Sequence, residues 1–147
     1  WEMEKSGLKN IIREKTFEAY TATEPWQKAV KSGAMAFADK LEGWLLFCGQ
    51  SGSGKTHLCT AVCRQRLLMG DEVRYMPWRE KVAELKALSL DNERRAEMIN
   101  RYKAAQILYI DDLYVQTYTL PDTVTGRIGI CVFDGSCELE LHAFAFL

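Results

Sequence analysis

One short loop sequence limits the folds open to this chain more than any other feature. Residues 49–56 read Gly-Gln-Ser-Gly-Ser-Gly-Lys-Thr and satisfy the pattern G-x-x-x-x-G-K-[ST] at every fixed position. Such a loop joins a buried strand to a helix, and its consecutive backbone N–H groups surround phosphate oxygens. An apolar run of strand length, residues 44–48, precedes it, and a helical pattern over residues 56–69 follows. The sequence therefore predicts a P-loop in an α/β domain.

The loop supplies the candidate nucleotide-binding residues, with ATP and Mg²⁺ as the expected cofactors. Its glycines carry no Cβ where the backbone must approach the ligand. Lys55 would reach the outer phosphates, and is therefore also a candidate catalytic residue, while the Thr56 hydroxyl would hold Mg²⁺. His57 is expected to pack beside the loop. The complete candidate set is Gly49, Gln50, Ser51, Gly52, Ser53, Gly54, Lys55, Thr56 and His57.

Composition excludes several other classes of protein. The 147 residues are 48% hydrophobic and 27% charged, as in an ordinary single globular domain, and the net charge of −1 gives no overall basic field. No apolar run approaches the roughly 18 residues of a membrane span, and the charged start lacks the apolar core of a signal peptide. The odd count of five cysteines, without a C-x-x-C pair, favours reduced, buried thiols. We therefore expect a cytoplasmic protein without a membrane partner, and the absence of an initial Met predicts a fragment of a longer chain.

Hydrophobic periodicity predicts the elements around the loop. A helix over residues 24–41 would begin at Thr23 as its N-cap and place Trp26 on its apolar face. Gly70 is the expected stop of the P-loop helix. The remaining predicted elements are a strand over residues 72–76, a helix over residues 79–90 and, after a break at residues 91–92, a helix over residues 93–104.

A second chemical signal lies at residues 107–112, where four apolar residues run into Asp111 and Asp112. Ligands of open α/β sheets bind at the carboxyl ends of the strands, which is where these carboxylates would lie. The pattern matches a Walker B strand: Asp111 would join Thr56 in holding Mg²⁺, and Asp112 would orient or deprotonate the attacking water. The spacing makes this the third strand. In P-loop ATPases of the additional-strand type, which this pattern resembles, a later strand inserts between the first and third; residues 127–133 are the candidate for it, and residues 138–147 could supply a fifth.

The segments around both motifs resemble the DnaC/DnaI-type bacterial and phage helicase loaders. The resemblance rests on Thr-His-Leu at the end of the P-loop, Tyr-Met-Pro-Trp-Arg-Glu over residues 75–80 and Leu-Tyr-Ile-Asp-Asp-Leu over residues 108–113. Further matches are Lys-Thr-Phe at residues 15–17 and Trp-Gln at residues 26–27. Together they cover roughly residues 5–114.

The resemblance implies an AAA+ ATPase domain with a mostly parallel sheet flanked by helices. Its implied partners are the hexameric replicative helicase and single-stranded DNA, with self-assembly in the ATP state. We expect residues 1–22 to be a lead-in and residues 23–147 the ATPase domain, of which residues 113–147 are atypical. That tail carries no recognisable sensor motif. Asp134 is a weak candidate sensor, and nothing marks Arg127 as an arginine finger.

Three other functions stay open. The IstB-type transposition ATPases are close in sequence, although the Tyr-Met-x-Trp-Arg segment favours a loader. A nucleotide-binding switch with negligible turnover is favoured by the atypical tail and by Asp, rather than Glu, at position 112. A small-molecule kinase is disfavoured because no Arg-rich lid is recognisable.

Overall fold

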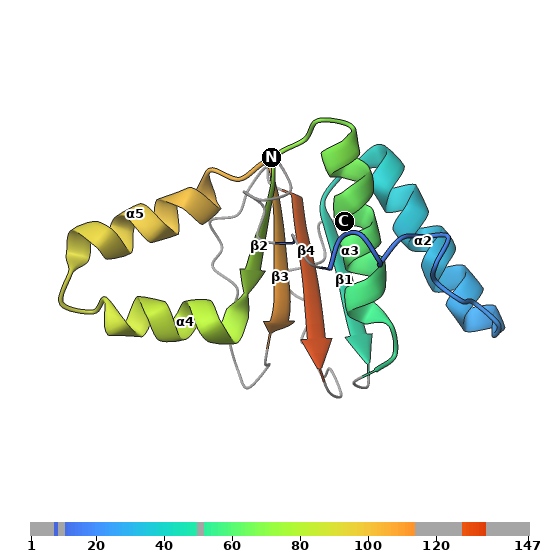
Figure 1. The fold of residues 1–147 in the computed structure, drawn as a ribbon, viewed down its shortest axis with the longest axis horizontal. Helices are drawn as coiled ribbons and strands as arrows, with labels where there is room; N and C mark the ends of the chain where they lie inside the picture. Colours follow the sequence, from blue (N-terminus) through green and yellow to red (C-terminus); the bar gives the residue numbers. More distant parts are fainter. Residues whose placement is uncertain (1–7, 9–10, 50–51, 114–127, 135–147) are drawn as a thin grey trace.

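A computed structural model describes residues 8, 11–49, 52–113 and 128–134. Within these ranges, β1 (Trp44–Gly49), β2 (Val73–Pro77), β3 (Ile107–Leu113) and β4 (Ile128–Asp134) form one parallel sheet. The strand order is β1-β4-β3-β2, so β4 lies between the first and third strands (Figure 1). This order confirms the predicted insertion. The expected fifth strand, at residues 138–147, lies outside the described residues.

Helices connect the strands and flank the sheet. α2 (Pro25–Lys40) precedes β1, α3 (Lys55–Leu68) joins β1 to β2, and α4 (Trp78–Ala87) and α5 (Asn92–Lys103) lie between β2 and β3. α3 packs on all four strands and α2 packs on α3. α4 and α5 form a hairpin that extends past the β2 edge of the sheet (Figure 1). The observed architecture therefore confirms the predicted parallel α/β fold.

The end of α3 follows from its sequence. Gly70 takes a φ of 97°, which lies in the left-handed region that glycine adopts readily. The N–H of Gly70 donates to the carbonyl of Leu67 at 3.1 Å, and the N–H of Asp71 donates to that of Arg66 at 3.1 Å. These two bonds form a Schellman motif, so the predicted stop at Gly70 is confirmed.

Capping also fixes the beginnings of α2 and α5. The predicted N-cap at Thr23 was wrong by one residue: Glu24 is the N-cap of α2 and forms a reciprocal capping box with Gln27. α5 begins after the predicted break: its N-cap is Asp91, whose side chain accepts a 3.1 Å hydrogen bond from the N–H of Arg94.

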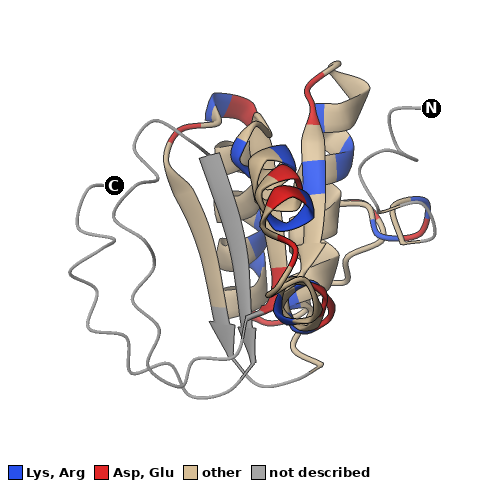
Figure 2. Ribbon diagram, turned by 90° about the vertical axis from the view of Figure 1, so that its left-hand side faces the viewer, with Lys and Arg blue, Asp and Glu red and all other residues tan. Residues whose placement is uncertain are grey.

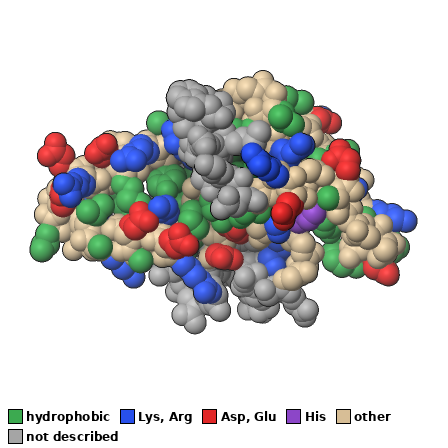
Figure 3. Space-filling model, viewed as in Figure 1, with side chains coloured by type: hydrophobic (Ala, Val, Ile, Leu, Met, Phe, Trp, Pro, Cys, Tyr) green, Lys and Arg blue, Asp and Glu red, His purple; other side chains and the backbone are tan. Residues whose placement is uncertain are grey.

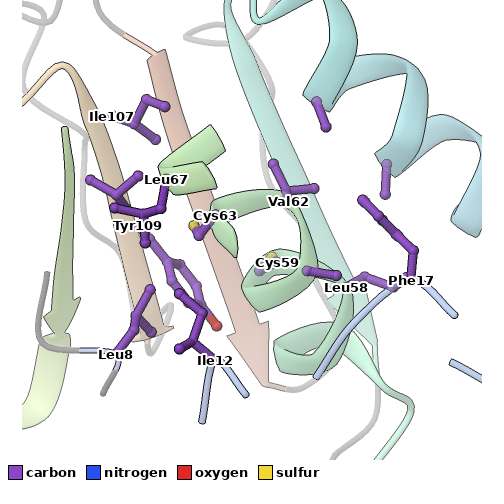
Figure 4. Close-up of a cluster of buried hydrophobic side chains, with 14 of the residues drawn as sticks. Leu8, Ile12, Phe17, Leu58, Cys59, Val62, Cys63, Leu67, Ile107 and Tyr109 are labelled. Carbon is purple, nitrogen blue, oxygen red and sulfur yellow. The ribbon is translucent and has the colours of Figure 1, made fainter. Parts of the chain in front are cut away.

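The main hydrophobic core lies between α3 and one face of the sheet (Figure 4). Side chains alternate along β3, so Ile107 and Tyr109 enter this core and Asp111 follows on the same face. Leu108 and Ile110 face the other side, in a second cluster. That cluster also holds Trp44, Leu46, Met76, Trp78 and Tyr102. Apolar side chains of β3 therefore pack on both faces of the sheet, which explains why this strand reads as a continuous apolar run.

The segment before α2 belongs to the main core. Two aromatic residues of this segment, Phe17 and Tyr20, are buried. Leu8 and Ile12, which sequence reasoning did not single out, are also buried, and Figure 4 shows both beside Tyr109. The sequence did not indicate their burial, because their neighbours are charged and the short segment has no helical hydrophobic periodicity.

The expectation that Trp26 packs on the apolar face of α2 was wrong. Its side chain is 53% exposed, whereas Ala34 and Ala38 are fully buried. Helices approach each other closely where small side chains lie at their contact, so α2 packs on α3 through Ala34 and Ala38. Among the described helices, none is long and apolar enough to cross a membrane.

Candidate nucleotide and metal site

The candidate site lies at the carboxyl ends of the parallel strands. The turn that follows β1 leads into α3, and the carboxyl end of β3 carries Asp111. Figure 1 shows that the first turn of α3 and the ends of β1, β3 and β4 lie at the same edge of the sheet. The topology therefore brings both sequence motifs together, as in other open α/β sheets.

The first turn of α3 has the properties of an anion site. Its N-cap is Gly54, which has no side chain to bond the free N–H groups, and the turn contains no acidic residue. Those N–H groups and the helix dipole favour a phosphate at this position. Lys55 is buried at 8% exposure, and its Nζ donates to Ser53 Oγ at 3.4 Å. The predicted phosphate-binding residues from 52 to 56 therefore share one short segment.

Thr56 and Asp111 meet although they are far apart in the sequence. The hydroxyl of Thr56 donates to Oδ1 of Asp111 at 3.3 Å. Asp111 is 5% exposed, and burial raises the pKa of its carboxyl, while a hydrogen bond from Tyr75 acts against that rise. The two residues predicted to hold the metal are thus adjacent in the fold.

Tyr75 is a residue of this site that sequence reasoning missed. Its hydroxyl donates to Oδ2 of Asp111 at 3.0 Å. Burial, followed by the neighbouring charge of Asp111, raises the pKa of Tyr75, so its hydroxyl stays protonated and remains a donor. No sequence signal gave the register of β2 against β3, and that register is what brings the phenol to the carboxylate.

Asp112 differs from Asp111 in its backbone and its exposure. Its φ is 56°, in the left-handed region, and its side chain is exposed. The ladder between β3 and β4 shifts register between Ile110 and Leu113, so Asp112 lies in a bulge. Asp111 is buried and Asp112 is exposed, so the two carboxylates lie in different environments.

His57 connects the P-loop helix to the preceding segment. Its Nε2 lies 2.7 Å from the carbonyl oxygen of Thr16, and its ring meets that of Tyr20 edge-on, with centroids 5.4 Å apart. These contacts place His57 beside the loop, as expected, and hold the Thr16–Tyr20 segment against it.

The donor set fits Mg²⁺ with a nucleotide. The Thr56 hydroxyl and the Asp111 carboxylate are hard oxygen ligands, which Mg²⁺ prefers, and Mg²⁺ usually takes only one or two protein ligands beside phosphates. Among the described residues, no three His, Cys, Asp or Glu side chains cluster as a metal cage. The residues present therefore suit a metal shared with a nucleotide rather than one enclosed by protein.

Some predicted residues cannot be placed. Gln50, Ser51 and Arg127 lie outside the described residues, and for Gly49 and Asp134 only the strand backbone is described.

Two described arginines, each a possible contact for DNA phosphates, form ion pairs within the chain. Arg66 forms an ion pair with Asp71, and Arg74 pairs with Glu72 at 3.1 Å. In Figure 2, Lys and Arg positions are interspersed with Asp and Glu positions along the described helices.

Comparison with solved structures identifies the fold. The crystal structure of the DnaC helicase loader superimposes with a TM-score of 0.71 at 16% identity, covering 92% of this chain and 86% of that one. That of DnaI gives a TM-score of 0.69 at 19% identity, covering 85% and 74%. The fold is that of an AAA+ P-loop ATPase domain.

Sequence comparison gives the family. The model of the IstB-like ATP binding protein family matches residues 3–122, so the chain belongs to that family of ATP-binding proteins. The replicative helicase loader DnaC of Escherichia coli K12 is 27% identical over 121 residues, covering 77% of this chain. The chain spans about half the length of that curated relative, 48%.

Proposed function

We propose that this chain is the Mg²⁺-dependent ATPase module of a protein that loads the replicative helicase onto single-stranded DNA. The observation that supports this proposal most strongly is the contact between Thr56 and buried Asp111, beside the first turn of α3, which has no side-chain cap. The similarity to proteins named replicative helicase loaders supports the finer assignment.

The proposed chemistry divides among few residues. N–H groups at the start of α3 and the Lys55 ammonium bind and orient the phosphates. Thr56 and Asp111 would hold Mg²⁺, which when bound would neutralise phosphate charge. Asp112 accepts a hydrogen bond from the attacking water and aligns it. Catalysis in this scheme is positional and electrostatic, so turnover depends on how completely the site is assembled.

The decisive experiment is steady-state ATP hydrolysis with single-stranded DNA titrated in and Lys55→Ala as the control. We expect DNA to stimulate turnover in the parent and not in the variant. Co-purification of the full-length protein with its helicase hexamer then tests the partner. If the hydrolysis rate does not depend on DNA and no helicase co-purifies with the protein, the loader assignment is refuted, but the assignment of nucleotide binding is not.

Two alternatives have observations of their own. The family name favours an IstB-type transposition ATPase, for which a transposase rather than a helicase would be retained in the same experiment. The atypical tail and the presence of Asp, rather than Glu, at position 112 favour a nucleotide switch. A switch would bind ATP tightly and show no turnover at any DNA concentration.

A further inference from the structure

Among the described residues, hydrogen-bond donors reach both carboxylate oxygens of Asp111. Oδ1 accepts from the Thr56 hydroxyl at 3.3 Å and from the N–H of Asp112 at 3.1 Å. Oδ2 accepts from the Tyr75 hydroxyl at 3.0 Å. Pro77 is the β2 residue in register with Asp111, and proline has neither an N–H nor a polar side chain to donate.

The position of Tyr75 explains how its hydroxyl supplies to Asp111 the hydrogen-bond donor that Pro77 lacks. Tyr75 is in register with Tyr109, two residues before Asp111, and its side chain lies on the α3 side of the sheet. Two residues of strand span about 6.6 Å, a distance that a phenol ring can bridge. The ring also packs on that of Tyr109, with centroids 5.0 Å apart, so the hydroxyl is aimed by packing as well as by its hydrogen bond.

We propose that Tyr75 is the positioning residue of the metal site: it holds Oδ2 of Asp111 and so directs Oδ1 toward Thr56 and Mg²⁺. The proposal rests on the proposed nucleotide function. Partners of metal-binding carboxylates commonly change metal affinity by about 10–100-fold when removed, so Tyr75 should affect the metal more than the nucleotide.

The test is binding of a fluorescent ATP analogue to the parent and to Tyr75→Phe, first in EDTA and then with MgCl₂ titrated in. Phe keeps the ring and its packing, so affinity in EDTA should agree within about twofold. The Mg²⁺ concentration that half-restores tight binding should rise about tenfold in the variant. Tyr75→Met, which fills space without a hydroxyl, should show the same rise and serves if Tyr75→Phe fails to fold.

Tyr102→Phe is the matched control, since Tyr102 lies in the second cluster on the other face of the sheet. It should leave the Mg²⁺ dependence unchanged. Equal Mg²⁺ dependence in the parent and Tyr75→Phe would overturn the role of Tyr75 while the proposed function stands. A parent that binds no nucleotide, with or without Mg²⁺, would overturn both.

Discussion

Substitution of Gly54 tests how closely the P-loop packs against the segment that precedes α2. It has a φ of 90°, and a Cβ built on it would lie 2.8 Å from Cε2 of Tyr20. Gly52 has a similar φ of 79°, but a Cβ there would meet nothing within 4 Å. The two glycines therefore separate the conformational cost of an added methyl group from its steric cost.

The expected magnitudes follow from these two contributions. A left-handed alanine costs about 1–2 kcal/mol, offset by about 0.4–1 kcal/mol because alanine restricts the unfolded chain. Gly52→Ala should therefore lower the free energy of unfolding by about 1 kcal/mol. Gly54→Ala adds overpacking of about 1–3 kcal/mol, because Tyr20 is buried and its ring edge also meets His57. We expect a total loss of about 2–4 kcal/mol.

Urea denaturation followed by tryptophan fluorescence, without nucleotide, measures the effect. Repeating Gly54→Ala in a Tyr20→Leu background removes the ring edge, so the steric part of the loss should disappear and the double-mutant cycle should show coupling above about 1 kcal/mol. Equal losses for Gly52→Ala and Gly54→Ala, or no coupling with Tyr20, would refute the proposed packing of Tyr20 on the loop.

Three further predictions concern single positions. Asp112→Asn should retain ATP binding and lose turnover at least about 100-fold. Asp112→Gly should raise the free energy of unfolding, because glycine adopts the left-handed backbone of this position without strain. Retained turnover in either variant would exclude Asp112 from catalysis. Cys59 and Cys63 are fully buried and burial raises the pKa of the Cys63 thiol, so peptide-resolved alkylation should reach both only on unfolding, and rapid labelling of the native protein would contradict this. Asp91→Ala should cost about 1 kcal/mol by removing the cap of α5, whereas an unchanged urea midpoint would show that the bond to Arg94 contributes little.

The order of the sheet was predictable because two motifs fixed two of its strands. The P-loop placed a strand at its amino side and the Asp pair placed the third, so an added strand had to come from the residues that form β4. The pairing of Thr56 with Asp111 was predicted from the same two motifs. The pairing used residue types whose chemistry restricts them to one end of a strand or helix, whereas the insertion of β4 followed from the resemblance to additional-strand P-loop ATPases.

Other features depended on packing that the sequence does not reveal. Trp26 follows the helical period of α2, yet its alanines make the contact and leave the indole exposed. Tyr75 became a site residue only through the register of β2 against β3. The hairpin of α4 and α5 presents apolar side chains between its two helices in Figure 3, and no period in the sequence predicted where that hairpin would lie.

The most direct test of the central claim is calorimetric titration of Mg·ATP into the parent and into Lys55→Ala. Lys55 is buried beside the first turn of α3, and a lost hydrogen bond to a charged group weakens binding by about 1.5–3 kcal/mol. We expect one ATP bound per parent chain and at least about tenfold weaker binding by the variant, with the folded structure retained. Equal binding by the two proteins would show that the P-loop is not the nucleotide site.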